Sequence, residues 1–312
     1  MMENLFIQFG ILVLSLAGLI IFAEKLIDAS AKLAKAFGIT EAVLGLTLLA
    51  YGTSLPEFAV SSIASVESHP ELSISNVLGS NIFNIAFIIG LAAFIRPLTV
   101  KEAHMRGRDN YMMVATALLL VALLFFSGGI SRPAGLMMVL LIVGYTYYLL
   151  KHDRSSSQLK KDETISKLKE TGIILACFAV VIISGKFTVD SAVAVAKGFG
   201  VSEWLIGATI VAAGTSLPEL AVSITAAKKG FFGISVGNIV GSNIFNILWI
   251  LGFAAALNPL SVDFDMIKWD SAFLLIVTFL FAYHLIKTKI SRKEGLLYIS
   301  IYFGYIAYLL TY

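Results

Sequence analysis

Two glutamates, Glu57 and Glu219, stand inside apolar stretches of this sequence, each as the last residue of the hexapeptide GTSLPE. A charged side chain at the centre of a bilayer costs at least about 2.5–3.5 kcal/mol, so such an acid indicates a functional site. A buried ion pair is the alternative, but no Lys, Arg or His falls within the core of an expected membrane span. The two carboxylates are therefore candidate ligands for a cation.

A proline precedes each glutamate and predicts a break in the helix that carries it. Pro56 has no N–H, so the carbonyl of Gly52 loses its helical partner, and Pro218 does the same to Gly214. Unpaired backbone at membrane depth is tolerated only where it lines a cavity or is buried in protein. A plain kink satisfied by a hydroxyl is the alternative. The recurrence of the whole hexapeptide favours carbonyls freed to bind an ion.

Helical spacing adds further oxygen atoms. Thr53 and Ser54 lie four and three residues before Glu57, on the same helix face. Polar side chains also recur every fourth residue along two other apolar segments, as Asn76, Ser80 and Asn84 and again as Asn238, Ser242 and Asn246. Hydrogen bonding between helices is an equal alternative for either stripe taken alone.

Carboxylates, hydroxyls, amides and freed carbonyls are all oxygen ligands, which Ca²⁺ binds in shells of about six to eight. No thiolate or imidazole accompanies them, which argues against zinc, copper and iron. The single cysteine, Cys177, excludes disulfides and Cys-based metal sites. Two negative charges balance one Ca²⁺ or two Na⁺, which predicts competition between these ions for one site.

An enzyme is the least favoured class of protein. The sequence has no nucleophile–base set and no cofactor loop, and its net charge of +3 gives no nucleic-acid footprint. Four histidines fall in loops or near the ends of expected spans, where we expect them to be solvated: His69, His104, His152 and His284.

The elements that must position these residues are those of a membrane protein. The 312 residues are 58% hydrophobic and 14% charged, with a mean hydropathy of +0.88, whereas soluble domains carry about 25% charged residues. About 20 apolar residues cross a bilayer. The sequence predicts an all-α membrane protein with ten transmembrane helices, at 5–23, 42–66, 76–95, 111–127, 133–150, 171–189, 204–227, 238–257, 270–286 and 295–311.

The first and sixth apolar patterns continue past these limits, toward Gly38 and Gly200. We therefore expect these two helices to be long, bent or strongly tilted. The N-terminal segment lacks a basic region and a small-residue cleavage site, so we expect a retained first span rather than a signal peptide.

The chain is an internal duplication. Adding 162 to a residue number maps residues 28–61 onto 190–223, and NVLGSNIFNI (76–85) onto NIVGSNIFNI (238–247). Five spans per copy is an odd number, so the copies must cross the bilayer in opposite directions. This predicts two inverted-topology five-helix repeats, 1–150 and 171–312, joined by a linker at 151–170. Such repeats are typical of secondary transporters with a midplane site.

Basic residues predict the orientation of the chain. Of the 23 Lys and Arg residues, only four fall on one side of the ten expected spans, namely Arg132, Lys186, Lys197 and Lys268. The crowded side is cytoplasmic by the positive-inside rule. We therefore expect a multi-pass protein of the cell membrane with extracellular termini and a cytoplasmic central loop.

The motifs GLTLLAYGTSLPE with NVLGSNIFNI, and GATIVAAGTSLPE with NIVGSNIFNI, resemble the two alpha-repeats of the calcium/cation antiporter superfamily, over residues 45–85 and 207–247. Within the superfamily they are similar to the sodium/calcium exchanger branch. The resemblance covers essentially all ten expected spans, and the short central loop resembles that of prokaryotic members.

The resemblance implies a set of ion ligands. Glu57 and Glu219 would share a central Ca²⁺, completed by the backbone carbonyls of Thr53 and Thr215. The implied ligands of flanking Na⁺ sites are Ser54, Ser80, Ser216 and Ser242 with the carbonyls of Ala50 and Ala212, and the residues that close the middle of the cluster are Asn84 and Asn246.

The resemblance also implies how the protein works. Its partners would be Ca²⁺ and Na⁺ as transported ions, and membrane lipid, with no cofactor, no nucleic acid and no obligate protein partner. The first and sixth helices would slide as a pair across the other eight.

The sequence departs from many relatives at one position, because they carry Asp where this chain has Asn246. Proton or potassium coupling therefore stays open.

A Na⁺/Ca²⁺ antiporter that expels Ca²⁺ is the leading hypothesis, with a cation/proton or potassium-coupled exchanger and a passive channel as alternatives. The proton-coupled branch typically carries a different acidic motif, and a closed central cluster favours alternating access over a continuous pore.

Overall fold

Helices account for nearly all of the chain that the computed structural model describes, which is residues 2–153, 166–199 and 212–311. The elements of the first half are α1 (Met2–Phe37), α2 (Glu41–Leu44), η1 (Gly45–Leu49), α3 (Ala50–Thr53), α4 (Leu55–Val66), α5 (Pro70–Ile82), η2 (Phe83–Ile89), α6 (Gly90–Ile95), β1 (Leu98–Thr99), α7 (Ala103–Arg106), α8 (Arg108–Ser127), β2 (Gly129–Ile130) and α9 (Arg132–His152). The segments labelled η are π-helical turns.

The second half repeats this order. Its described elements are α10 (Lys167–Gly198), α12 (Ala212–Gly214), α13 (Leu217–Lys229), α14 (Phe232–Phe245), η4 (Asn246–Leu251), α15 (Gly252–Leu257), β3 (Leu260–Ser261), α16 (Phe264–Ile286), β4 (Lys289–Ile290) and α17 (Arg292–Thr311).

The all-α membrane class is confirmed. Within the described residues, seven helices are long and apolar enough to cross a membrane, or eight if the bent pair Glu41–Thr53 and Leu55–Val66 is one span. Of the other two expected spans, 204–227 lies partly outside the described residues. The last one, 295–311, coincides with α17, which is not among these helices. Most of the expected linker at 151–170 also lies outside the described residues.

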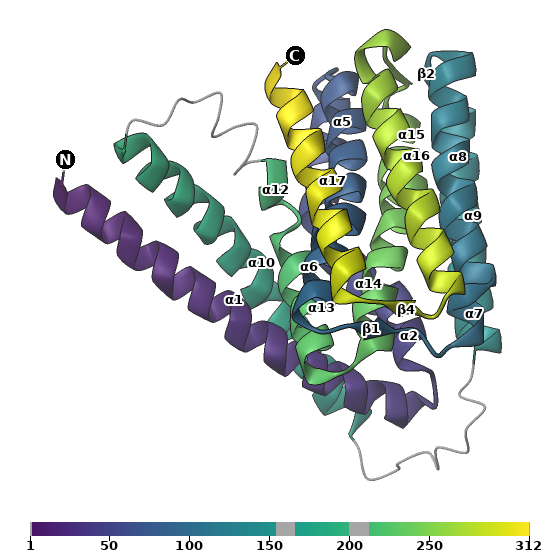
Figure 1. The fold of residues 1–312 in the computed structure, drawn as a ribbon. Helices are drawn as coiled ribbons and strands as arrows, with labels where there is room; N and C mark the ends of the chain where they lie inside the picture. The colour runs from purple at the N-terminus through teal and green to yellow at the C-terminus, as the bar shows by residue number, and fades with distance from the viewer. Residues whose placement is uncertain (1, 154–165, 200–211, 312) are drawn as a thin grey trace.

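The expected excess length of the first and sixth helices is confirmed. Helix α1 has 36 residues and α10 has 32, which correspond to about 54 and 48 Å at 1.5 Å per residue. Both exceed the roughly 30 Å of a bilayer core. The two helices pack side by side along their length, at an angle to the remaining helices (Figure 1).

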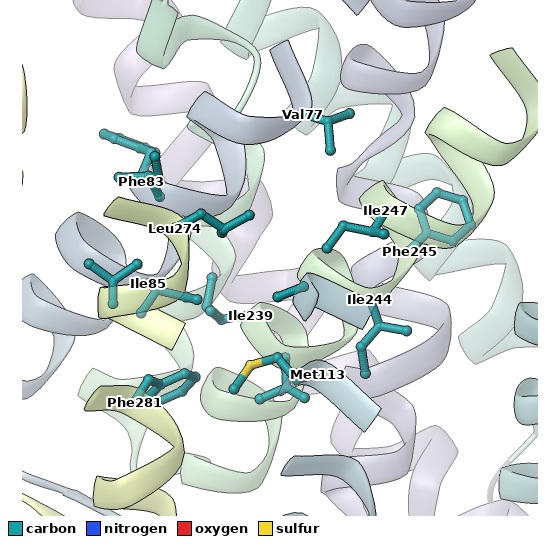
Figure 2. Packing of buried hydrophobic residues seen from close by; sticks show 14 of the residues in the cluster. Val77, Phe83, Ile85, Met113, Ile239, Ile244, Phe245, Ile247, Leu274 and Phe281 are labelled. Carbon is teal, nitrogen blue, oxygen red and sulfur yellow. The ribbon is translucent and has the colours of Figure 1, made fainter. Parts of the chain in front are cut away.

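Two continuous helical segments form the centre of the molecule, α5–η2–α6 and α14–η4–α15. The most apolar windows of these segments are 72% and 83% buried, against 11% for α1. Figure 2 shows their apolar side chains, including Ile85 and Ile239, packed with Met113 of α8 and Leu274 and Phe281 of α16. The polar stripes predicted on these two segments therefore lie in the interior of the fold.

Glycine allows the close approach of α14 and η1. A Cβ at Gly241 would lie 2.4 Å from the Leu46 carbonyl oxygen, and one at Gly45 would lie 2.8 Å from the Ile234 carbonyl oxygen. A side chain at either position would therefore prevent this contact. Gly79 differs, because its Cβ would have nothing within 4 Å and this face of α5 lines a cavity of about 700 Å³.

Two short antiparallel strand pairs tie the halves of the chain together. Strand β1 pairs with β4, with Leu98 opposite Ile290, and β2 pairs with β3, with Ile130 opposite Leu260. In each pair one strand comes from each half. The pairs lie at opposite ends of the helices (Figure 1), so each end is fastened by a contact between the halves.

Candidate cation-binding site

Glu57 is positioned by the predicted helix break. Helices α3 and α4 meet at Ser54, whose φ of −83° and ψ of 13° depart from helical values, and the helix axis bends there by 49°. Backbone bonding resumes with Phe58 N–H donating to the Ser54 carbonyl at 3.1 Å. Pro56 occupies the first turn of α4, where its missing N–H costs nothing. Glu57 follows in the same turn and is fully buried.

The second hexapeptide repeats this geometry. Ser216 has a φ of −89° and a ψ of 13°, Pro218 occupies the first turn of α13, and Glu219 is fully buried one residue later. Each carboxylate thus lies at the N-terminal end of a helix, where the positive end of the helix dipole favours an anion. Because the two breaks match so closely, the local geometry is set by the hexapeptide itself.

The two hexapeptides bind each other reciprocally. Ser216 donates its hydroxyl proton to Glu57 Oε1 at 2.7 Å, and Ser54 donates to Glu219 Oε1, also at 2.7 Å. Each serine belongs to one repeat and each carboxylate to the other. Residues 159 and 165 positions apart in the sequence therefore form one polar cluster.

Within the part of the chain that the structure describes, the carboxylates have no cationic partner. No ion pair within the described residues involves Glu57 or Glu219, so the buried-ion-pair alternative has no support there. The described residues also contain no cluster of three or more His, Cys, Asp or Glu side chains. The charged groups found at the site are therefore two carboxylates, and the oxygen atoms of their neighbours are neutral.

Half of the predicted site residues carry buried polar atoms that lack a hydrogen-bond partner. These atoms are Glu57 Oε2, Glu219 Oε2, Ser80 Oγ, Thr215 Oγ1, Asn246 Oδ1, and both Nδ2 and Oδ1 of Asn84. The hydroxyls of Ser80 and Thr215 face the Glu57 carboxylate. Native proteins leave few such atoms, and each costs about 1–3 kcal/mol. Unpaired oxygens on both carboxylates and on the two hydroxyls beside Glu57 are what a cation-binding site requires.

The remaining predicted ligands have partners of their own. Thr53 donates its hydroxyl to the carbonyls of Leu49 and Ala50, at 3.0 and 3.3 Å, and Ser242 donates to the Ala50 carbonyl at 3.4 Å. The Ala50 carbonyl therefore lies beside side chains from both repeats. Ala212 is the first residue of α12.

The polar stripes divide into two kinds of residue. Asn76 donates to Ser61 Oγ at 2.9 Å, and Asn238 donates to Ser223 Oγ at 3.0 Å, so these two asparagines hold neighbouring helices together. The interhelical alternative is thus right for Asn76 in the first stripe. In the second stripe it is right for Asn238, and the predicted ligands Ser242 and Asn246 also donate to neighbouring helices.

The structure adds features that the sequence did not predict. Asn84 lies in the π-helical segment η2 and Asn246 begins η4, and π-helical turns occur frequently at functional sites. Two further buried asparagines, Asn81 and Asn243, join the cluster, because Asn246 Nδ2 donates to Asn81 Oδ1 at 2.9 Å and Asn81 Nδ2 to the Asn243 carbonyl at 3.2 Å. Their signal is the repetition of GSNIFN, which places a second asparagine three residues before each predicted one.

The expectation that all four histidines are solvated is wrong for two of them. His69 and His152 are exposed. His284 is only 4% exposed, because the last turn of α16 packs against α17, where His284 Nδ1 lies 2.8 Å from the Tyr298 hydroxyl. His104 is partly buried, with Nδ1 2.7 Å from Asp109 Oδ2. Neither ring contacts the site glutamates.

A family model described as "sodium/calcium exchanger protein" matches residues 7–151 and 169–311, which is most of the chain. The chain belongs to the sodium/calcium exchanger family. It is therefore a multi-pass membrane protein and a cation antiporter, and the exclusion of an enzyme is confirmed because its relatives are transporters.

Individual members of the family match over nearly their whole length. The chain is 31% identical to the sodium/calcium exchanger MaX1 of Methanosarcina acetivorans, over 97% of this chain and 98% of that protein. It is 34% identical to the inner membrane protein YrbG of Escherichia coli, over 88% of this chain and 87% of that protein. Among solved structures, the sodium-calcium exchanger NCX_Mj soaked with zero Na⁺ and Ca²⁺ matches at a TM-score of 0.87 and 29% identity, covering 98% of this chain and 99% of that one.

Proposed function

We propose that this chain exchanges Na⁺ for Ca²⁺ across the cell membrane by alternating access, with Glu57 and Glu219 as the shared ligands of a midplane site. The observation that carries the proposal is the reciprocal pair of hydrogen bonds from Ser216 to Glu57 and from Ser54 to Glu219. These bonds bring one buried carboxylate from each repeat into a single cluster, in which the second oxygen of each carboxylate has no hydrogen-bond partner.

The free atoms fit Ca²⁺ as a transported ion. Each carboxylate holds one oxygen in a hydrogen bond and leaves Oε2 without a partner. Two such oxygens supply two negative charges, which neutralise one Ca²⁺, and the carbonyls of Thr53 and Thr215 stand four residues before the glutamates to complete the shell. No cofactor is required, because the ion is cargo.

Flanking Na⁺ sites use the neutral oxygens. A serine hydroxyl that donates its proton to a carboxylate keeps its lone pairs available for a cation, and Ser54 and Ser216 are both in this state. Ser80 and Ser242 and the carbonyls of Ala50 and Ala212 complete these sites, with Asn84 and Asn246 between them. Since the same two carboxylates serve both ions, Na⁺ and Ca²⁺ compete.

Exchange is electrogenic on this account. The site carries two negative charges, which one Ca²⁺ balances and which three Na⁺, the number that the family resemblance implies, exceed by one. A cycle that exchanges three Na⁺ for one Ca²⁺ therefore moves net charge and responds to membrane potential, at about 2.3 kcal/mol per charge per 100 mV.

The fold that we propose around this site has ten transmembrane helices in two inverted five-helix repeats. An offset of 162 residues supports this arrangement. It relates the first hexapeptide to the second, the first helix break to the second, and strand β1 to strand β3. The distribution of Lys and Arg orients both termini outward and the central loop toward the cytoplasm. Lipid contacts α1, whose side chains, such as Phe6 and Leu14, are largely exposed.

Helices α1 and α10 form the moving part. They pack mainly on each other, and their largest contact with the rest of the fold is that of α1 with α13, so we infer that they can slide together without opening the core around α5 and α14. Their excess length keeps apolar surface in the bilayer at both ends of the movement. Sliding then exposes the site alternately to the two sides.

The test is flux in proteoliposomes that contain the purified full chain. Uptake of ⁴⁵Ca²⁺ is followed after imposing an outward gradient of Na⁺, H⁺ or K⁺, each alone and in pairs. We expect uptake with the Na⁺ gradient alone. Uptake driven only by the H⁺ gradient would overturn Na⁺ coupling in favour of proton exchange, and a need for K⁺ would make the exchange potassium-coupled. If Ca²⁺ uptake proceeds without any imposed gradient and stops when Ca²⁺ reaches equilibrium, the protein is a channel.

A further inference from the structure

Four buried asparagines connect the two central segments of the fold. Asn81 and Asn84 come from the first repeat, and Asn243 and Asn246 are their equivalents at an offset of 162. All four side chains are at most 2% exposed. If the repeats were equivalent here, their hydrogen bonds would come in matching pairs. They do not.

A chain of hydrogen bonds runs in one direction only. Asn81 Nδ2 donates to the Asn243 main-chain carbonyl at 3.2 Å, and Asn246 Nδ2 donates to Asn81 Oδ1 at 2.9 Å. A main-chain carbonyl can only accept, so the amide nitrogen of Asn81 must be the atom that faces it. The Oδ1 atom of Asn81 therefore faces Asn246. Because this oxygen can only accept, Asn246 must donate to it from Nδ2.

This order of donors leaves the Oδ1 atom of Asn246 without a hydrogen bond. Asn246 Oδ1 is buried and has no hydrogen-bond partner. Had the amide been turned around, its NH₂ group would point away from Asn81, and the hydrogens on that nitrogen would repel a cation. The backbone carbonyl of Asn243 thus fixes, through Asn81, which atom of Asn246 stays free.

The equivalent bonds in the opposite direction are absent. Asn243 Nδ2 donates to the Ile239 carbonyl of its own helix at 2.7 Å. Asn243 Oδ1 and both polar atoms of Asn84 have no partner. The hydrogen bonds among the described residues therefore fix which way the amide of Asn246 points, and none of them does so for Asn84.

We propose that Asn81 is a positioning residue for ion binding, which holds the side-chain oxygen of Asn246 toward the cation, and that its equivalent Asn243 has no such role. This inference rests on the proposed function of the site. It makes the two halves of the site unequal although their sequences are nearly the same. Partners that orient metal ligands in this way typically contribute tenfold to 100-fold to metal affinity.

The decisive comparison is Asn81→Ala against Asn243→Ala in the full chain. The Asn243 substitution is a matched control, because it removes the same side chain at the equivalent position and keeps the main-chain carbonyl that Asn81 uses. We measure the Ca²⁺ concentration for half-maximal Na⁺-driven uptake in proteoliposomes. We expect it to rise about tenfold or more for Asn81→Ala and by less than about threefold for Asn243→Ala. Equal effects of the two substitutions would overturn the proposal.

A double substitution separates positioning from a general structural role. If Asn81 acts through Asn246, then Asn81→Ala adds less than about twofold in the Asn246→Ala background, because there is no amide left to orient. A structural role would instead give independent, additive effects. Additivity would therefore overturn the proposal, as would an Asn246→Ala variant with the affinity of the wild type.

Folding is controlled by a second variant. Asn81→Leu keeps the branched shape and the number of side-chain heavy atoms and removes both hydrogen bonds, so it replaces Asn81→Ala if the smaller residue prevents folding. The wild-type protein and Glu57→Gln distinguish failure of the inference from failure of the proposed function. A wild type without Na⁺-driven uptake refutes the function itself. Normal wild-type uptake that Glu57→Gln abolishes, with Asn81→Leu unaffected, refutes only the positioning role.

Discussion

Replacing either reciprocal serine by alanine should weaken ion binding strongly. In the Ser54→Ala variant, Glu219 Oε1 loses the hydroxyl that donates to it, and in Ser216→Ala the same happens to Glu57 Oε1. Both serines and both carboxylates are fully buried, so water has no ready access to replace the hydroxyl. The ionised carboxylate is then poorly solvated, and its orientation toward the ion is lost.

The magnitude follows from the kind of bond that is removed. Hydrogen bonds to charged groups contribute about 1.5–3 kcal/mol, and 1.36 kcal/mol corresponds to a factor of ten. We therefore expect the Ca²⁺ concentration for half-maximal uptake to rise about tenfold to 150-fold in each variant. Because both bonds measure 2.7 Å between equally buried groups, the two substitutions should have similar effects.

The assay is the initial rate of ⁴⁵Ca²⁺ uptake into Na⁺-loaded proteoliposomes over a range of external Ca²⁺. Ser62→Ala is the matched control, because Ser62 lies on the same helix as Glu57 and its hydroxyl has no hydrogen-bond partner. It should behave like the wild type. If Ser54→Ala and Ser216→Ala also match Ser62→Ala while all variants are folded, the reciprocal bonds do not support the site.

Three further predictions concern charge, protonation and packing. An imposed membrane potential, set with an ionophore, should change the rate of Na⁺-driven Ca²⁺ uptake, whereas potential-independent uptake would indicate a two-for-one exchange. Asn246→Asp should make uptake more sensitive to pH between about pH 6 and 8, because an ionised carboxylate there would meet the acceptor oxygen of Asn81 and would add a third negative charge to the proposed site; overlaying pH profiles for variant and wild type would contradict this. Gly241→Ala should lower the thermal unfolding temperature in detergent, because its Cβ would lie 2.4 Å from the Leu46 carbonyl oxygen, at a cost of about 1–3 kcal/mol. Gly79→Ala is the control, with open space at the Cβ, and equal unfolding temperatures would refute the packing argument.

The sequence predicted the helix breaks and their glutamates well, for local reasons. Proline fixes where hydrogen bonding must fail, and this depends only on its own ring. The breaks therefore fall at Ser54 and Ser216, two residues before each proline. The length of α1 and α10 was equally predictable, because an apolar pattern that outruns the bilayer is visible in the sequence.

The partners of individual polar groups could not be predicted in the same way. Helical spacing placed Asn76, Ser80 and Asn84 on one stripe, but only the packing of α4 against α5 decides that Asn76 bonds to Ser61. The four-residue spacing also passed over Asn81 and Asn243. Only the packing of the two central segments against each other shows that Asn81 bonds to the Asn243 carbonyl and to Asn246.

The histidines show a related limit. A residue near the end of a span is solvated only if no other helix covers it. The turn that carries His284 is covered by α17, where Tyr298 and Glu294 supply its partners. Such a contact joins elements whose pairing depends on tertiary packing, so hydropathy alone does not reveal it.

The central claim is that Glu57 and Glu219 together bind the transported ion, and the most direct test is Na⁺-driven ⁴⁵Ca²⁺ uptake by Glu57→Gln and Glu219→Gln. Glutamine keeps the shape of each side chain and removes half of the negative charge of the site. Glu67→Gln is the control, because Glu67 is exposed at the end of the same helix as Glu57. The account predicts uptake at the level of empty liposomes for both site variants and normal uptake for the control. Near-normal uptake in either site variant would contradict it.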